Sequence, residues 1–300
     1  MIDIDSYKCG FVAIIGKPNV GKSTLMNHLI GQKLSIISPK PQTTRQNLKG
    51  ILSDDKKQII FVDTPGFLKS RYELHDRMLD YIRNSLRDSD LIVFITDANK
   101  FPTDYDRELL EELRKVRLPK IALLNKIDLI DKEIVAEKVA RLKDDFDTVI
   151  PISALHGEYT GDLADTFAEM LPFSPPLYDP ENLSDLPMRF FAQEMIREKI
   201  FLNFDDEIPY ATAVLIDRYN ETDEKVEIDA SIWIERDSQK PIIIGKGGQK
   251  IKKVRISAQR DLKKFVGKPV KMELFVKIKK NWRKKTSSLN ELGFKNYRKK

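Results

Sequence analysis

The chain has 300 residues, of which 41% are hydrophobic, and this length predicts two domains because one hydrophobic core rarely grows so large. Its one cysteine, Cys9, excludes an intramolecular disulfide, and its apolar runs, such as LIVFI, are far shorter than the roughly 20 residues of a membrane-spanning helix. The net charge of +6 averages two unlike parts, since residues 241–300 hold 20 Lys and Arg against 3 Asp and Glu and the rest of the chain is acidic. We expect a cytoplasmic protein whose basic end binds a polyanion, the alternative being a solvated charged face.

Short apolar runs rich in β-formers alternate with amphipathic segments from residue 10 to about residue 171. The runs are FVAII, IIFVD, LIVFITD, IALLN and TVIPIS. This rhythm predicts an α/β domain over residues 1–178, with a mostly parallel sheet covered by helices on both faces. In GILSDDKKQIIFV two strand-like runs meet at a tight polar turn, which predicts an antiparallel hairpin.

Residues 172–187, PFSPPLYDPENLSDLP, contain five prolines and suit neither a helix nor a central strand. We expect a linker over residues 179–185 and a smaller α/β domain over residues 186–300. That domain is predicted to contain a helix, two alternating strands, a glycine loop, a second helix and a final strand. The second helix is indicated by apolar residues at helical spacing, namely Ile251, Val254, Ala258, Leu262 and Phe265.

A phosphate-binding pattern, G-x-x-x-x-G-K-[ST], lies between the strand FVAII and the helix-like KSTLMNHLI. In such a loop, backbone N–H groups surround the β-phosphate, Lys22 reaches the β and γ oxygens, and the Ser23 hydroxyl binds Mg²⁺. We therefore expect the nucleotide to contact Gly16, Lys17, Pro18, Asn19, Val20, Gly21, Lys22 and Ser23.

The sequence LLNKID identifies the base, because it places Asn125, Lys126, Ile127 and Asp128 after a buried strand. The Asp128 carboxylate can accept two N–H bonds from guanine, whereas adenine would leave it unpaired. The nucleotide is therefore expected to be GTP, with GDP as the product. In ISAL, which follows the next strand, Ser153 and Ala154 are expected beside the base, and the Ala154 N–H can bond guanine O6.

Two further loops follow strands at the same edge of the predicted sheet. In DTPG, Asp63 can reach Mg²⁺ through water and the Gly66 N–H can sense a γ-phosphate, so we expect Asp63, Thr64, Pro65, Gly66 and Phe67 at the nucleotide. In QTTRQ a threonine hydroxyl can complete the Mg²⁺ shell, and Thr44 is favoured over Thr43. Ser23, Thr44 and Asp63 are thus the predicted metal ligands. Because the motifs stand in the order that a P-loop GTPase requires, they favour GTP hydrolysis.

The quoted motifs, GKPNVGKS, QTTR, DTPG, NKID and SAL, together with IIIGKGGQKIK, resemble the Era family of bacterial ribosome-assembly GTPases, in the translation-factor-related class. The resemblance runs from about residue 10 to residue 280. It implies a GTPase domain joined to a KH domain that binds the 3′ end of small-subunit ribosomal RNA and assists assembly of that subunit. It further implies that GTP switches RNA affinity through the loops at Thr44 and Gly66.

Phe67 departs from Ras-like GTPases, because it stands where a water-orienting glutamine would follow the DTPG motif. Its alternative role is to pack in the core. The family resemblance associates Asn19 with a K⁺ ion near the phosphates, where the cation would replace an arginine finger. The alternative is that Asn19 only shapes the turn. The expected catalytic residues are Lys22, Thr44, Gly66 and Asn19.

The second glycine loop, GKGGQK, has no Ser or Thr after its lysine and no second DxxG or NKxD motif, so we do not expect it to bind a nucleotide. Gly245, Lys246, Gly247 and Gly248 instead fit the GXXG loop that KH domains place against single-stranded RNA. Lys250, Lys252 and Lys253 extend the positive surface toward RNA. In the basic tail, Trp282 is expected either to stack on a base or to pack in the core.

Two other functions remain open on the sequence alone. The protein could be an RNA-binding scaffold in which GTP is structural, and RNA-stimulated turnover would distinguish that scaffold from an enzyme. It could also contact a membrane surface through the basic tail, which liposome flotation with competing RNA would test. We expect a monomer.

Overall fold

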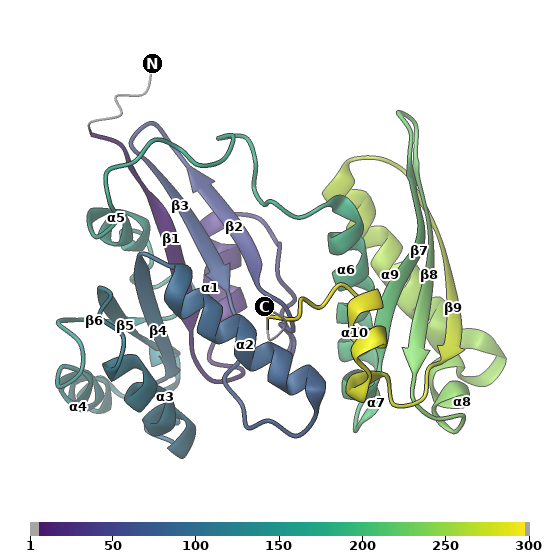
Figure 1. The fold of residues 1–300 in the computed structure, drawn as a ribbon, viewed down its shortest axis with the longest axis horizontal. Coiled ribbons are helices and arrows are strands. Elements are labelled where there is room, and N and C mark those ends of the chain that lie inside the picture. The colour runs from purple at the N-terminus through teal and green to yellow at the C-terminus, as the bar shows by residue number, and fades with distance from the viewer. Residues whose placement is uncertain (1–5, 298–300) are drawn as a thin grey trace. The chain divides into compact units, whose positions relative to one another are not determined.

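The computed structural model describes residues 6–297, which form two compact units (Figure 1). The first unit comprises the chain up to residue 70 together with residues 78–185, and the second comprises residues 71–77 and the chain from residue 186 onward. Residues 179–185, the expected linker, cluster with the first unit. No helix in the described part of the chain is long and apolar enough to span a membrane.

The first unit is built around a six-stranded sheet in the order β2-β3-β1-β4-β5-β6. All pairings are parallel except β2 with β3, so the expected hairpin and the mostly parallel sheet are both confirmed. Its strands are β1 (Lys8–Ile15), β2 (Leu48–Ser53), β3 (Lys57–Asp63), β4 (Leu91–Asp97), β5 (Lys120–Asn125) and β6 (Thr148–Ile152). Its helices are α1 (Lys22–Ile30), α2 (Glu73–Asp88), whose first turn clusters with the second unit, α3 (Asp104–Arg114), α4 (Lys132–Leu142) and α5 (Leu163–Glu169).

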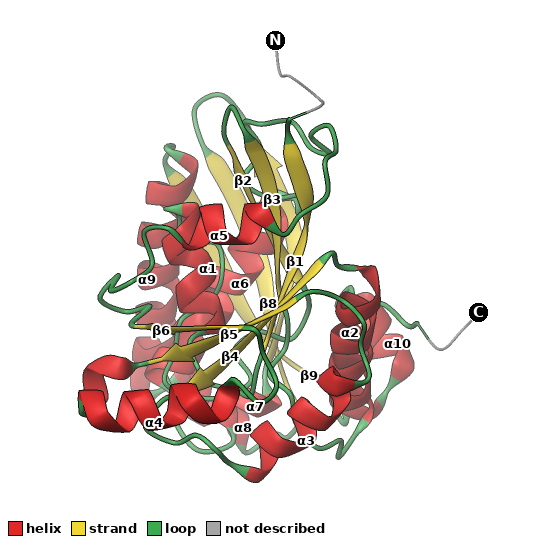
Figure 2. Cartoon of the chain, turned by 90° about the vertical axis from the view of Figure 1, so that its left-hand side faces the viewer, coloured by secondary structure: helices red, strands yellow, loops and turns green. Residues whose placement is uncertain are grey.

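Helices cover both faces of this sheet, with α1 and α5 beside one face and α2 and α3 beside the other in Figure 2. All seven residues of β4 are buried, as expected for a central strand whose two faces are both covered. The hairpin between β2 and β3 turns at Asp54, whose carboxylate accepts the backbone N–H groups of Lys56 and Lys57. The helices on both faces and the hairpin turn together stabilise this sheet. The predicted nucleotide residues lie at its carboxyl edge.

The second unit has a three-stranded sheet in the order β7-β8-β9, with β7 antiparallel and β9 parallel to β8. It comprises α6 (Met188–Asn203), α7 (Ile208–Ala211), β7 (Ala213–Glu221), β8 (Val226–Ile234), α8 (Gln239–Ile244), α9 (Gln249–Val266), β9 (Val270–Ile278) and α10 (Thr286–Glu291). Alternate residues of β8 pack against α6 and α9 in one core. The helical spacing read from the sequence is confirmed, since Val254, Ala258 and Leu262 are fully buried in that core. The predicted fold class, a GTPase-like α/β domain followed by a smaller α/β domain, is confirmed.

Candidate functional site

A cavity of about 430 Å³ lies at the carboxyl edge of the parallel strands of the first unit. Open α/β sheets bind ligands at this edge. The predicted nucleotide residues that line it are Pro18, Asn19, Gly21, Lys22, Ser23, Thr44, Gly66, Asn125, Lys126 and Asp128. The sequence motifs therefore converge on one site, although they are spread over more than a hundred residues of the chain.

The loop between β1 and α1 ends at Lys22, the first residue of α1, whose side chain is buried. The Lys22 ammonium donates to the carbonyl oxygens of Gly16 and Lys17 at 3.1 and 3.0 Å. Burial lowers the pKa of Lys22 to about 8, and the nearby Asp63 carboxylate opposes part of this shift. Gly21 has φ 104°, and a Cβ there would lie 2.3 Å from the side-chain nitrogen of Asn125, so this position requires glycine. The loop thus offers a buried cation and close backbone to an anionic ligand.

Asp63, at the end of β3, gathers three hydroxyl groups. Its Oδ2 accepts from Ser23 at 2.7 Å, from Ser35 at 2.8 Å and from Thr44 at 3.2 Å. Burial raises the pKa of this carboxyl group, while Lys22 and the three hydroxyls oppose the rise. Its other oxygen, Oδ1, is buried with no hydrogen-bond partner among the described residues.

The unpartnered Asp63 oxygen and the two hydroxyls of Ser23 and Thr44, whose oxygens lie 3.1 Å apart, form a set of hard oxygen donors. Mg²⁺ prefers such donors and completes its shell with phosphate and water. Within the described residues no group of three or more His, Cys, Asp or Glu side chains could hold a metal by itself. The donor set therefore fits a cation that arrives with a phosphate ligand.

Asn125, the last residue of β5, and Asp128 also line the cavity, and both side chains are held by hydrogen bonds. The Asn125 amide donates to the Val20 carbonyl at 2.6 Å and accepts the Ala154 N–H at 2.9 Å. Ser153 donates to Asp128 Oδ1 at 2.5 Å, which orients that carboxylate. The Ala154 N–H, which the sequence suggested for guanine O6, is donated to Asn125 in this structure.

Several predicted residues support the cavity from behind without lining it. Thr64 donates to the Ile14 carbonyl at 2.8 Å, and the Phe67 N–H donates to the Gly16 carbonyl at 3.1 Å. The Phe67 side chain packs against the sheet core, as its alternative role proposed. The predicted nucleotide residues that do not line the cavity are Gly16, Lys17, Val20, Asp63, Thr64, Pro65, Phe67, Ile127, Ser153 and Ala154.

Sequence reasoning missed several residues at the site, among them Leu129, Leu155 and Ser35. Leu129 and Leu155 line the cavity with 58% and 74% of their surface exposed, so they can cover the faces of a flat base. Leu129 directly follows the NKID motif and Leu155 ends the ISAL motif, and that adjacency was the available signal. The Ser35 hydroxyl bonds to Asp63 because the buried Asn27 side chain holds the Ser35 backbone in place. No sequence motif predicts the contact between Asn27 and Ser35.

The second glycine loop connects α8 to α9. Gly245 has φ 74°, and a Cβ there would lie 2.7 Å from the Lys250 side chain, so the close approach requires glycine. Gly247 and Gly248 also have positive φ, at 57° and 77°, and Lys246 is exposed between them and Gly245. The α9 helix starts directly after this loop, so its free N–H groups and Lys246 can meet phosphates together.

The lysines of the first α9 turn are all exposed, namely Lys250, Lys252 and Lys253. The Lys250 ammonium also lies 5.6 Å from the centre of the Phe204 ring. The base-stacking role of Trp282 is wrong, because this side chain is fully buried and its Nε1 donates to the Ala211 carbonyl at 2.8 Å. The basic surface therefore consists of lysines around a backbone loop.

Comparisons with known proteins match each unit to a family. A family model described as 50S ribosome-binding GTPase matches residues 11–126, and a KH domain model matches residues 207–283. Two solved structures are similar over almost the whole length. One, an Aquifex aeolicus Era variant bound to GDP and AlF₄⁻, has 36% identity and a TM-score of 0.92, covering 96% of this chain and 100% of its own.

The other structure is Era in complex with MgGDPNP and nucleotides 1506–1542 of 16S ribosomal RNA. It also has 36% identity and a TM-score of 0.92, covering 97% of this chain and 100% of its own. These two similarities extend across both units and both glycine loops.

Proposed function

Because the chain belongs to the Era family of GTPases, we propose that it hydrolyses GTP in its first unit and binds the 3′ end of small-subunit ribosomal RNA through its second, assisting assembly of that subunit. The observation that carries this proposal is a cavity lined by both the buried Lys22 and Asp128, which Ser153 orients. Such a cavity can hold phosphates at Lys22 and guanine at Asp128.

Hydrolysis rests on charge compensation in the proposed site. Lys22 binds the β and γ oxygens, and the Gly66 N–H donates to the γ-phosphate. Thr44 holds its own loop over the phosphates. Ser23, Thr44 and Asp63 hold Mg²⁺, which neutralises charge on the transferring phosphate. The unpartnered Asp63 oxygen supports this assignment. Water attacks without a glutamine to orient it, because the Phe67 side chain packs in the core.

We expect GTP hydrolysis to be about tenfold faster in K⁺ than in Na⁺ at matched ionic strength, because a cation at Asn19 would supply the charge of an arginine finger. Asn19 borders the cavity, and its amide donates to the Pro39 carbonyl at 2.6 Å. Phe67→Ala should change the chemical step little. Single-turnover rates in the two salts measure the effect, and equal rates would remove K⁺ from the mechanism.

Nucleotide binding should take up a proton at alkaline pH. Burial lowers the pKa of Lys22 to about 8 in the free protein, and bound phosphates would raise it. Above that pH the free lysine is neutral, so GDP affinity should fall by about tenfold between about pH 7 and pH 9. Calorimetry at pH 8.5 in buffers of different ionisation enthalpy would measure the proton, and zero uptake would contradict the assigned role of Lys22.

The RNA assignment follows the second unit. The exposed Lys246 and the backbone of Gly245, Gly247 and Gly248 meet RNA phosphates, and Lys250, Lys252 and Lys253 extend the contact. The description of the first family model names the large ribosomal subunit, but that model matches only residues 11–126 of the first unit. The Era structure that spans both units contains 16S RNA, so the proposal names the small subunit.

The test is to measure GTP turnover and RNA binding in the same preparation. We expect slow hydrolysis that is faster with a 3′-terminal 16S RNA fragment than with an unrelated RNA of equal length. Binding of GTP without turnover would indicate that the protein is an RNA-binding scaffold in which GTP is structural. Failure to bind either ligand would refute the proposal.

The proposal also covers the location, the oligomeric state and the regulation of the protein. We place the protein in the cytoplasm as a monomer, with GTP raising or lowering its RNA affinity through the loops at Thr44 and Gly66. The basic residues from 241 onward also support peripheral contact with anionic membranes. Flotation with anionic liposomes, with and without competing RNA, tests that contact.

A further inference from the structure

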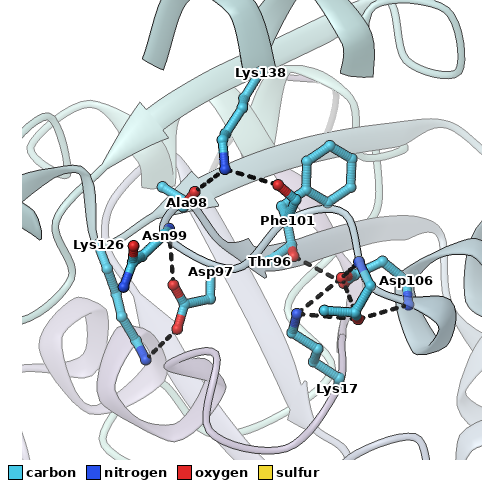
Figure 3. Close-up of polar contacts among 10 residues, drawn as sticks. Lys17, Thr96, Asp97, Ala98, Asn99, Phe101, Asp106, Lys126 and Lys138 are labelled. Atoms are coloured by element: carbon cyan, nitrogen blue, oxygen red, sulfur yellow. Dashed lines mark hydrogen bonds and ion pairs between the residues drawn. The ribbon is translucent and has the colours of Figure 1, made fainter. Parts of the chain in front are cut away.

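Lys17, the first residue after Gly16 in the phosphate loop, does not line the nucleotide cavity. Only 8% of its surface is exposed, and its ammonium lies 2.8 Å from the carboxylate of Asp106 and 3.3 Å from the Thr103 hydroxyl (Figure 3). A lysine in a phosphate loop can bind the phosphates of the ligand directly. The Lys17 side chain instead points toward the interior of the protein.

Asp106 has no exposed surface and lies in the first turn of α3. Besides Lys17, its carboxylate accepts from the Thr96 hydroxyl at 2.8 Å and from the N–H and hydroxyl of Thr103 at 2.8 and 2.7 Å. Thr96 lies in β4, and Thr103 caps α3. The phosphate loop is therefore attached through one side chain to both a central strand and a helix.

The next residue of β4 supports the other side of the same loop. Asp97 forms an ion pair with Lys126 at 2.8 Å, and Lys126 also donates to the Asn19 carbonyl at 2.7 Å. Between the two attachments, Lys138 donates to the carbonyls of Ala98 and Phe101, which braces the turn after β4 (Figure 3). Two consecutive β4 residues thus fix the loop at Lys17 and at Asn19.

We propose that Lys17 and Asp106 form a positioning pair, which holds the phosphate loop in the geometry that nucleotide binding requires. A buried ion pair stabilises a fold no better than well-packed apolar residues, so stability alone does not account for it. The elements that the pair connects do account for it, because the pair joins the phosphate loop to the most buried part of the sheet. Misplacing a binding loop by about an ångström can cost far more affinity than one lost contact. This inference rests on the proposed function at the same site.

Three variants of the full-length chain test the pair. Thr96 bonds to Oδ1 of Asp106 and Thr103 bonds to Oδ2, so Asp106→Asn keeps only one of these two acceptors and leaves the Lys17 ammonium buried without a counterion. Lys17→Met keeps the side-chain length but removes the charge. The double variant removes the charge pair without leaving a buried charge. The matched control is Asp104→Asn in the same helical turn, where the ion pair with Arg107 is exposed.

The readouts are thermal unfolding and the Kd and dissociation rate of a fluorescent GDP. Both single variants should lower the melting temperature and raise the Kd by at least about tenfold. The double variant should recover the part of the melting temperature that the unpaired charge removes, but not the affinity, while Asp104→Asn should match wild type in both. A merely structural pair would recover both together.

Two results would overturn the inference: a double variant that binds GDP like wild type, or one that fails to fold, since the pair would then serve the fold itself. If wild type does not bind GDP at all, the proposed function fails first. The wild-type titration therefore separates the two failures.

Discussion

Asp128→Asn should lower the affinity for GTP by at least about a hundredfold and create affinity for xanthosine triphosphate. The Asp128 carboxylate, oriented by the Ser153 hydroxyl at 2.5 Å, can accept both the ring N–H and the 2-amino group of guanine. Asparagine would turn one acceptor into a donor, which faces the amino group of guanine but pairs with the oxygen of xanthine. Sites built around buried hydrogen bonds discriminate at this level because a mismatch leaves groups unpaired.

Titration of GTP, ATP and xanthosine triphosphate against both forms of the protein measures this change. Asp131→Asn is the matched control, because Asp131 lies at the start of α4, three residues further on, and its side chain makes no capping hydrogen bond. An unchanged preference for GTP in the Asp128 variant would remove this residue from base recognition.

The double substitution of Lys246→Asp and Gly247→Asp should weaken RNA binding by about a hundredfold, or about 2.7 kcal/mol. Two carboxylates would replace a lysine and bare backbone at the phosphates, and fewer counterions would be released, so the salt dependence should also flatten. Gly247 has φ 57°, which aspartate tolerates better than most residues, and no atom lies within 4 Å of a Cβ built there. The variant should therefore fold and keep its GTP affinity.

Lys225→Asp with Asn220→Asp makes the same change in net charge in the hairpin of β7 and β8, at the end of the sheet away from α8 (Figure 1). This control should bind RNA nearly as tightly as wild type. Equal losses in both variants would mean that net charge, and not the glycine loop, determines RNA affinity.

The cavity could be predicted because its residues are local motifs placed at strand ends. A parallel sheet brings the carboxyl ends of its strands to one edge, so the order of Lys22, Asp63 and Asp128 along the chain already implies their proximity. The GXXG loop was readable for a similar reason, since short-range spacing defines both the glycines and the α9 face that packs in the core.

Contacts between remote residues were not readable. The Lys17–Asp106 pair joins residues 89 positions apart, and neither side chain has a sequence neighbour that indicates the other. Trp282 lies in a strongly basic tail, yet it is fully buried and its indole N–H donates to the Ala211 carbonyl. Tertiary packing decides such cases, and hydrophobic periodicity carries no information about them.

We propose that the two glycine loops of one chain hold different phosphates at the same time. Native mass spectrometry of the protein with a non-hydrolysable GTP analogue and a 3′-terminal 16S RNA fragment would detect this. We expect a ternary complex containing one protein, one nucleotide and one RNA, and the variant with Lys246→Asp and Gly247→Asp should retain only the nucleotide. Displacement of the nucleotide by RNA in the wild-type protein, with no ternary species, would mean that the two ligands compete for one site.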